Sequence, residues 1–213
     1  MILMNPIFEL SCGQTIPPNN IHAVSVSIPQ MADIIGYEEK HPDTMRKIKS
    51  GYPRFVPHPY ILQIQQLLHE KFSVDKNKAV VLVSSHLAAE ELFDFLGKQV
   101  EMIEDQSIFA VCVEKDSPDY KNTRSFLQHT GYSPSSRLAE QYLFEKGTLI
   151  DTFDERIYLE ADPQEFINNT LRDAYGLKES AGISLGICGM NAVFSALKSI
   201  ERVQQKEERN IFV

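Results

Sequence analysis

The chain has 213 residues, of which 43% are hydrophobic and 23% are charged, and its formal net charge is −8. These values are ordinary for a soluble globular protein and leave room for one large domain or two small ones. The acidic balance argues against a nucleic-acid or anionic-membrane partner, because such binding relies on clustered Lys and Arg. No apolar run is long enough to span a bilayer, and the start, "MILMNPIFEL", lacks the basic region and cleavage site of a signal peptide.

The cysteines and histidines give no sign of a metal centre. Cys12, Cys112 and Cys188 are far apart and odd in number, and no CxxC pair exists. We therefore expect free thiols in a reducing cytoplasm, and no disulfide framework. Cys188 has no histidine partner that the sequence can assign, which disfavours a nucleophile. The six histidines show no spacing typical of metal ligands.

The first third of the chain predicts an extended arm followed by short helices. Residues 1–20 contain Gly and Pro, and 22–29 alternate as a strand that Pro29 ends. Two helical pieces, broken at His41-Pro42, are predicted over 30–51. After a proline-rich loop, one helical face is predicted to hold Ile61, Ile64, Leu67, Leu68 and Phe72.

The middle of the chain predicts a strand–helix–strand unit. Continuous apolar runs over 78–85 and 107–114 are typical of buried strands, and a helix is predicted between them over 86–97. This order indicates a parallel βαβ unit. Residues 115–135 are polar and predicted to be a loop, and 135–147 are predicted to be a helix.

The last part begins with a strong helix signal. Asp162 is a good N-cap, Pro163 suits the first helical position, and Glu165 stands where a capping-box carboxylate occurs. Gly176 is expected to end this helix. Residues 182–187 are predicted to be a strand, followed by an amphipathic helix whose apolar stripe comprises Met190, Val193, Phe194, Leu197, Ile200 and Val203.

The fold class predicted from these elements is α/β, with a mixed or parallel sheet and flanking helices. We expect three regions, namely an N-terminal arm with helices over 1–75, an α/β insert over 76–176, and the start of a larger domain over 177–213. The final "IFV" reads as the first residues of a further strand.

Two weak signals for anion binding stand out. The turn from Gly186 to Met190 precedes a helix, and Gly189 has no Cβ, so free N–H groups there could approach a phosphate. No glycine-rich phosphate motif is present, and an ordinary connection can carry a glycine equally well. In "GYPRF", prolines stiffen the chain around Tyr52 and Arg54, which suits a guanidinium that binds phosphate or carboxylate. The alternative is a surface loop with Tyr52 and Phe55 packed into the core.

Three segments together resemble a known family. "SCGQTIPPNNIHAVSVSIPQMADIIGYEEK", "SGYPRFVPHPYI" and "GICGMNAVFSALKSI" are similar to the N-terminal half of cystathionine γ-synthase-like proteins of the long-N-terminus fungal and bacterial subgroup. These are pyridoxal-phosphate (PLP) enzymes of Cys and Met metabolism. The resemblance implies an incomplete fold type I transferase architecture, cytoplasmic location, an amino-acid substrate and a homodimer. It implies that Gly189 and Met190 hold the PLP phosphate together with Tyr52 and Arg54 of the neighbouring subunit.

The chain also departs from the family pattern. A long insert separates the two motifs, and "VSSHLAAEEL" over 83–92 offers a competing alignment in which His86 replaces the glycine, a poorer choice for close phosphate approach. In the family, the Schiff-base lysine, the aspartate at the pyridine nitrogen and the stacking aromatic residue follow the Gly-Met helix. No residue here matches them, so we assign no catalytic residue and expect a fragment that is inactive and free of PLP alone.

Two other classes of function remain open. The chain could be a stand-alone α/β small-molecule-binding or regulatory module in which the region 78–175 is the functional part. It could also be an unrelated α/β nucleotide binder, although the absence of any phosphate-loop motif counts against this.

Overall fold

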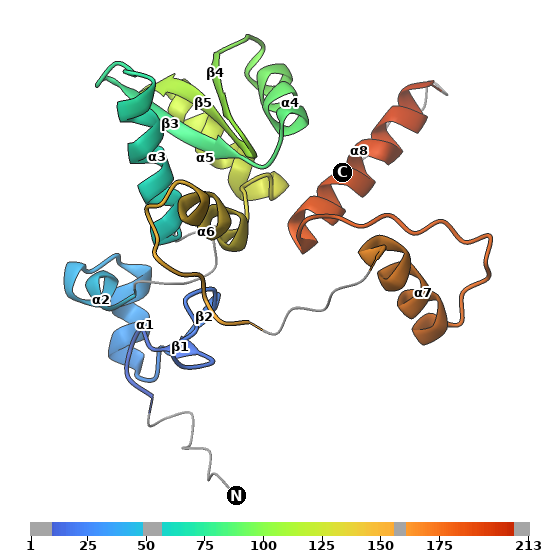
Figure 1. Cartoon of the computed structure of the whole chain (residues 1–213), viewed down its shortest axis with the longest axis horizontal. Coiled ribbons are helices and arrows are strands. Elements are labelled where there is room, and N and C mark those ends of the chain that lie inside the picture. The colour runs from blue at the N-terminus through green and yellow to red at the C-terminus, as the bar shows by residue number, and fades with distance from the viewer. Residues whose placement is uncertain (1–9, 49–56, 156–160, 207–213) are drawn as a thin grey trace, which may run out of the picture. The chain divides into compact units, whose positions relative to one another are not determined.

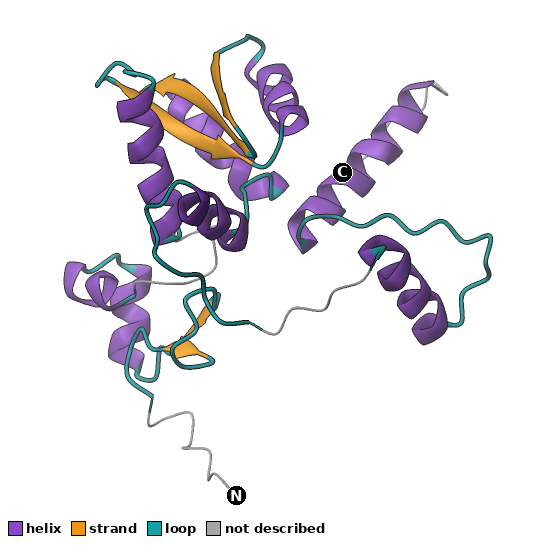
Figure 2. Ribbon diagram, in the orientation of Figure 1, coloured by secondary structure: helices purple, strands orange, loops and turns teal. Residues whose placement is uncertain are grey.

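The structure, a computed structural model, describes residues 10–48, 57–155 and 161–206. The chain divides into two compact units, with the boundary between Phe153 and Asp154. Unit 1 contains a mixed arrangement of helices and small antiparallel sheets, and the described residues of unit 2 form two helices. Figure 1 labels the elements, and Figure 2 separates helices from strands by colour.

Unit 1 begins with a small antiparallel ribbon and a helix pair. β1 (Thr15–Ile16) pairs with β2 (Ser25–Val26), so the strand expected over 22–29 is confined to two residues. α1 (Met31–Glu38) and α2 (Pro42–Lys47) confirm the two helical pieces that meet at His41-Pro42.

The central sheet has three strands in the order β3-β5-β4. α3 (Pro59–Lys71) leads into β3 (Lys78–Val83), α4 (His86–Leu96) follows, and β4 (Glu101–Asp105) and β5 (Ile108–Glu114) form a hairpin. Both neighbours of β5 run antiparallel to it, with Val81 opposite Val111 and Ile103 opposite Ala110.

The prediction that the strands at 78–85 and 107–114 form a parallel βαβ unit is therefore wrong, because these two strands are antiparallel. β4 lies between the helix predicted at 86–97 and the strand predicted at 107–114, where no strand was expected. The helix returns the chain to β4, which is parallel to β3, and β5 then inserts between the two strands. Since β4 is short and carries exposed acidic residues, it lacks the continuous apolar run by which a buried strand is recognised.

Two more helices complete unit 1. α5 (Pro118–Thr130) occupies the region expected to be a loop, and that prediction is wrong. The helix is rich in polar residues, but Ser117 caps its first turn and Thr123, Phe126 and Thr130 are buried. α6 (Ser136–Glu145) confirms the helix predicted over 135–147, with Ser135 as its cap.

Helices cover both faces of the sheet (Figure 2). On one face, Val80, Leu82 and Ala110 pack with buried residues of α3 and α6, among them Ile64 and Leu143. On the other face lie residues of α4 and α5, and this cluster comprises Val81, Val83, Ala88, Ala89, Leu92, Val111, Val113 and Phe126. Strands buried on both faces read as continuous apolar runs, which explains why β3 and β5 were found from the sequence.

Unit 2 contains α7 (Pro163–Tyr175) and α8 (Gly189–Lys206). The predicted start and end of α7 are confirmed, because the Asp162 carboxylate accepts a hydrogen bond from the Glu165 N–H at 2.9 Å and Gly176 is a left-handed cap. The strand expected over 182–187 is wrong, since these residues are irregular. A strand needs a partner for its backbone groups, and no described residue pairs with this segment.

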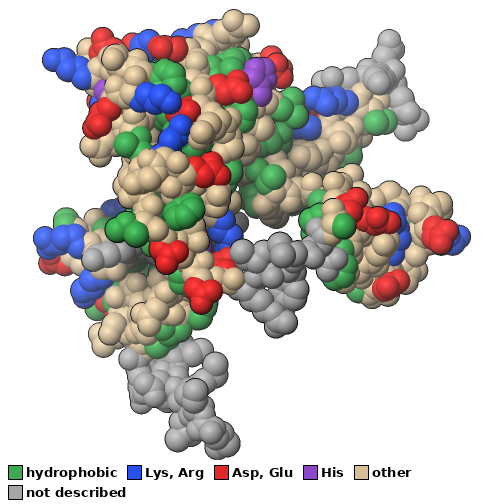
Figure 3. Space-filling view, viewed as in Figure 1, with side chains coloured by type: hydrophobic (Ala, Val, Ile, Leu, Met, Phe, Trp, Pro, Cys, Tyr) green, Lys and Arg blue, Asp and Glu red, His purple; other side chains and the backbone are tan. Residues whose placement is uncertain are grey.

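The helices of unit 2 expose apolar side chains. α7 has no buried residue. On α8, the exposed large apolar side chains are Val193, Leu197, Ile200 and Val203. Among the residues that the structure describes, no helix combines the length and apolar character needed to cross a bilayer. On the face drawn in Figure 3, basic and acidic side chains are interspersed over the described elements.

Candidate functional site

The turn that leads into α8 is held by its own side chains. The Sγ of Cys188 accepts a hydrogen bond from the Asn191 N–H at 3.4 Å, so Cys188 caps the helix. The Asn191 Oδ1 accepts a hydrogen bond from the Ile187 N–H at 3.3 Å. Cys188 therefore has a structural contact that the sequence did not indicate.

The two glycines of this turn have different surroundings. A Cβ on Gly186 would lie 2.8 Å from the Ala192 nitrogen, so backbone packing requires a glycine there. A Cβ on Gly189 would meet nothing within 4 Å. Gly186 is thus the glycine required by the fold, whereas open space surrounds Gly189.

Several hydrogen-bond donors without a partner lie at the start of α8, next to Gly189. Among the described residues, the backbone N–H groups of Gly189 and Met190 have no hydrogen-bond partner. The Asn191 side chain is 7% exposed, and its Nδ2 also lacks a partner in the described part of the chain. The first N–H groups of a helix carry a partial positive charge, so this end of α8 fits an anion such as a phosphate.

The other predicted phosphate ligands, Tyr52 and Arg54, lie outside the described residues, and their role stays a prediction. The competing segment over 83–92 forms the end of β3 and the start of α4. There the Ser85 Oγ accepts a hydrogen bond from the Ala88 N–H at 3.1 Å, so Ser85 caps α4. The imidazole of His86 is exposed and lies 3.5 Å from the Glu90 carboxylate.

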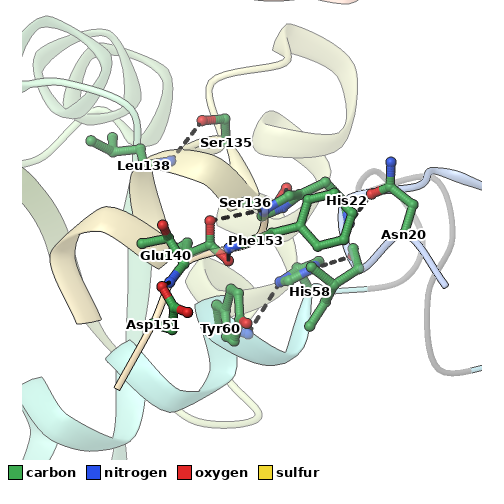
Figure 4. Close-up of polar contacts among 12 residues, drawn as sticks. Asn20, His22, His58, Tyr60, Ser135, Ser136, Leu138, Glu140, Asp151 and Phe153 are labelled. Carbon is green, nitrogen blue, oxygen red and sulfur yellow. Dashed lines mark hydrogen bonds and ion pairs between the residues drawn. The ribbon is translucent and has the colours of Figure 1, made fainter. Parts of the chain in front are cut away.

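A buried polar cluster in unit 1 was not predicted from the sequence (Figure 4). The His22 ring lies between two partners, with Nδ1 2.9 Å from the Ser136 Oγ and Nε2 3.2 Å from Oε2 of Glu140. The other carboxylate oxygen of Glu140 accepts a hydrogen bond from the Phe153 N–H at 3.0 Å. Both His22 and Glu140 are buried, so the cluster ties the N-terminal arm to α6.

A second histidine stacks beside the first. The rings of His22 and His58 are nearly parallel, with centroids 5.8 Å apart. The Nε2 of His58 lies 2.8 Å from the Ile21 carbonyl, and its Nδ1 accepts the Tyr60 N–H at 3.2 Å, which fixes the neutral tautomer with the proton on Nε2. Burial lowers the pKa of His58 and so also favours this neutral form.

The sequence gives only one weak indication of this cluster. Glu140 stands on the apolar side of a predicted helix, next to Ala139 and one turn from Leu143, where a carboxylate is unusual unless it has partners. Its partner His22 is 118 residues away in the sequence.

The described residues provide no metal site, and one of the three thiols is protected from reaction by burial. No group of three or more His, Cys, Asp or Glu side chains among them has the arrangement of a metal site. Burial raises the pKa of the Cys112 thiol to about 11, which keeps it protonated and unreactive at neutral pH. None of the three cysteines forms a disulfide in the part of the chain that the structure describes.

Comparison with known proteins reveals several relatives. Over 197 residues the chain is 34% identical to an L-2-amino-4-chloropent-4-enoate dechlorinase/desaturase of Streptantibioticus cattleyicolor, a match that covers 92% of this chain and 39% of that protein. It is 28% identical to the cystathionine gamma-synthase of Saccharomyces cerevisiae over 62% of this chain, and 28% identical to that of Neurospora crassa over 68%. These matches span 24% and 28% of the two fungal enzymes.

The chain thus spans well under half the length of the curated relatives it matches. No family model matches it. No solved structure matches it either. The resemblance found in the sequence is confirmed: the chain is a relative of the cystathionine gamma-synthases and similar enzymes, and its partial coverage of them is consistent with an N-terminal part of such an enzyme.

Proposed function

We propose that this chain is the N-terminal portion of a PLP-dependent transsulfuration enzyme that forms carbon–sulfur bonds by γ-replacement, like cystathionine γ-synthase. The Schiff-base lysine and its companions would come from the part of the enzyme that this chain does not cover, so the chain alone has no turnover. The names of its relatives and the 24–39% of their length that it matches support this proposal.

The observation that carries the proposal is the open helix start at Gly189. Two free backbone N–H groups and the unpaired Asn191 Nδ2 stand where the family resemblance puts the PLP phosphate. Gly189 and Met190 would hold the phosphate, and Tyr52 and Arg54 of the neighbouring subunit would complete the site. When bound, PLP supplies an electron sink for carbanions formed on an amino-acid substrate.

The same proposal implies several features of the whole enzyme. The whole enzyme would act on a small amino-acid substrate, work as a homodimer in the cytoplasm and contain a fold type I coenzyme domain. Residues 177–213 would begin that domain, 76–176 would be an insert, and 1–75 would be the arm and helices that carry Tyr52 and Arg54.

Replacing Gly189 with proline tests this proposal by removing one backbone N–H group. Proline removes the N–H at the first helical position, where it is compatible with a helix, whereas Gly189→Ala keeps the N–H and adds a Cβ into open space. Without the Schiff-base lysine the chain should retain no PLP of its own, but added pyridoxal phosphate should still occupy the phosphate site reversibly. In amide NMR spectra titrated with pyridoxal phosphate, we therefore expect the signals of Gly189 and Met190 to shift in the unmodified chain. The Ala variant should respond at residues 189 and 190 in the same way, and the Pro variant should show a weakened response at Met190.

Pyridoxal without the phosphate is the matched ligand, and it should leave these two signals unchanged. Shifts produced equally by both ligands, or none near residue 189 at saturating pyridoxal phosphate, would refute the phosphate site. A stable visible imine band on the chain alone would contradict the absence of the Schiff-base lysine.

One observation favours the second candidate, a stand-alone small-molecule-binding or regulatory module. Unit 1 covers both faces of its sheet with its own helices, as an independent domain does. Saturable binding of a small metabolite to unit 1, with no response at Gly189 to pyridoxal phosphate, would favour this module over the coenzyme enzyme.

A further inference from the structure

Ser136, His22 and Glu140 form a hydrogen-bonded series in unit 1 (Figure 4). The Nε2 of His22 faces a carboxylate, which only accepts hydrogen bonds, so the proton of the neutral ring lies on Nε2. Its Nδ1 is then an acceptor, and the Ser136 hydroxyl donates to it over 2.9 Å. The series is thus a serine hydroxyl, an imidazole able to take its proton, and a carboxylate behind the imidazole.

The carboxylate of Glu140 is held in place by a further donor. Its Oε1 accepts a hydrogen bond from the Phe153 N–H at 3.0 Å. Burial and this carboxylate raise the pKa of Tyr60, so the phenol remains a donor. A fixed carboxylate sets the orientation of the histidine and stabilises the imidazolium that forms when the ring takes a proton.

The serine faces a cavity, whereas its two partners lie behind it. A cavity of about 80 Å³ is lined by Ser136 together with His58, Arg124, Gln128 and Ser133, and neither His22 nor Glu140 lines it. Val81 and Leu82 of β3 also line it. Ser136 is also the first residue of α6, so the positive end of the helix lies beside its hydroxyl. The volume suits a short acyl group.

We propose that Ser136 is a nucleophile that accepts a short acyl group from an activated ester and passes it to water. The Ser136 Oγ forms a bond to the acyl carbon while its proton moves to Nδ1 of His22. The bond to the leaving alcohol breaks, and the alcohol departs with that proton. Water then attacks the acyl-serine by the same route in reverse, which releases the carboxylic acid and restores the serine. The reaction rests on unit 1 and is independent of the coenzyme function.

A small fluorophosphonate tests the nucleophile directly on the full chain. The Ser136 Oγ replaces fluoride at phosphorus, so intact-mass and peptide spectra should show one adduct on the peptide that contains Ser136. Ser136→Ala should abolish it. Glu140→Gln, which keeps the shape of the side chain, should slow labelling about 100-fold because His22 loses its carboxylate partner. Glu140→Asp should recover part of the rate if its carboxylate still reaches the ring.

The chain contains its own control pair. Ser125 lies 3.4 Å from Nδ1 of His129 on the exposed surface of α5, and no carboxylate is paired with that histidine among the described residues. Ser125→Ala should leave the labelling unchanged. Folded protein, verified by circular dichroism, that labels Ser136 no faster than Ser125 would overturn the proposal. So would equal labelling rates for the unmodified chain and a folded Glu140→Gln variant.

Discussion

Replacing Leu143 with alanine will lower the free energy of unfolding of unit 1 by about 2–5 kcal/mol. The Leu143 side chain is fully buried in the cluster that joins α6 to α3, among residues that include Ile64 and Leu68. Alanine loses the buried methyl groups and leaves a cavity, and its higher helix propensity offsets only a few tenths of a kcal/mol. Urea denaturation followed by far-ultraviolet circular dichroism measures the change.

The neighbouring Phe144 supplies the control. Its side chain is 42% exposed on the same helix, so Phe144→Ala should cost clearly less than Leu143→Ala. Equal losses for the two variants would mean that α6 does not pack on α3 through the face described here.

Asp105→Asn will produce the second large effect, a loss of about 1–3 kcal/mol at neutral pH. The Asp105 carboxylate is buried and accepts hydrogen bonds from Tyr142 at 2.9 Å and from Lys146 at 3.1 Å, with Lys71 as a third donor. Asparagine retains an acceptor for Tyr142 but removes the negative charge that faces the two ammonium groups. The free energy of unfolding from urea titrations measures the difference.

The Asp105 effect has a defined pH dependence. Burial alone would raise the pKa of Asp105, but the hydrogen bonds from Lys71, Tyr142 and Lys146 outweigh it and hold the pKa below its ordinary value. A carboxyl whose pKa is lower in the folded state stabilises the fold above its unfolded pKa of about 4, and this stabilisation is lost as the pH falls through the folded pKa. The difference between the unmodified chain and Asp105→Asn should therefore be constant near neutral pH and shrink below about pH 4.

Glu104 lies next to Asp105 on β4 but is exposed. Glu104→Gln should change the free energy of unfolding by less than about 0.5 kcal/mol. If Asp105→Asn and Glu104→Gln have the same small effect at neutral pH, the network of lysines and tyrosine around Asp105 does not stabilise the fold.

The parts of the fold that the sequence predicts well are those determined by neighbours along the chain. The start of α7 depends on Asp162 and Pro163, and its end on Gly176, so the capping pattern was sufficient. The helices on either side of His41-Pro42 are a similar case. The strand partners depend instead on contacts between distant residues, and the antiparallel place of β5 between β3 and β4 could not be read from periodicity.

The same distinction between contacts along the chain and contacts between distant residues applies to the candidate sites. The helix start at Gly189 was found because the turn and the helix are contiguous, although the structure gives the required close packing to Gly186 and the open space to Gly189. The cluster around His22 was not found because its members come from the N-terminal arm, α3 and α6. Only folding brings these side chains together, and each alone resembles an ordinary polar residue.

The central claim is that two remote parts of the sequence bind one phosphate across a subunit interface. Pyridoxal phosphate binding, measured by equilibrium dialysis, should fall in both Arg54→Ala and Gly189→Pro. In a homodimer, an equal mixture of the two variants contains sites in which Gly189 of one subunit faces Arg54 of the other. We expect such a mixture to regain about a quarter of the intact sites after subunit exchange. Two folded variants whose mixture binds no more coenzyme than either alone would contradict the claim.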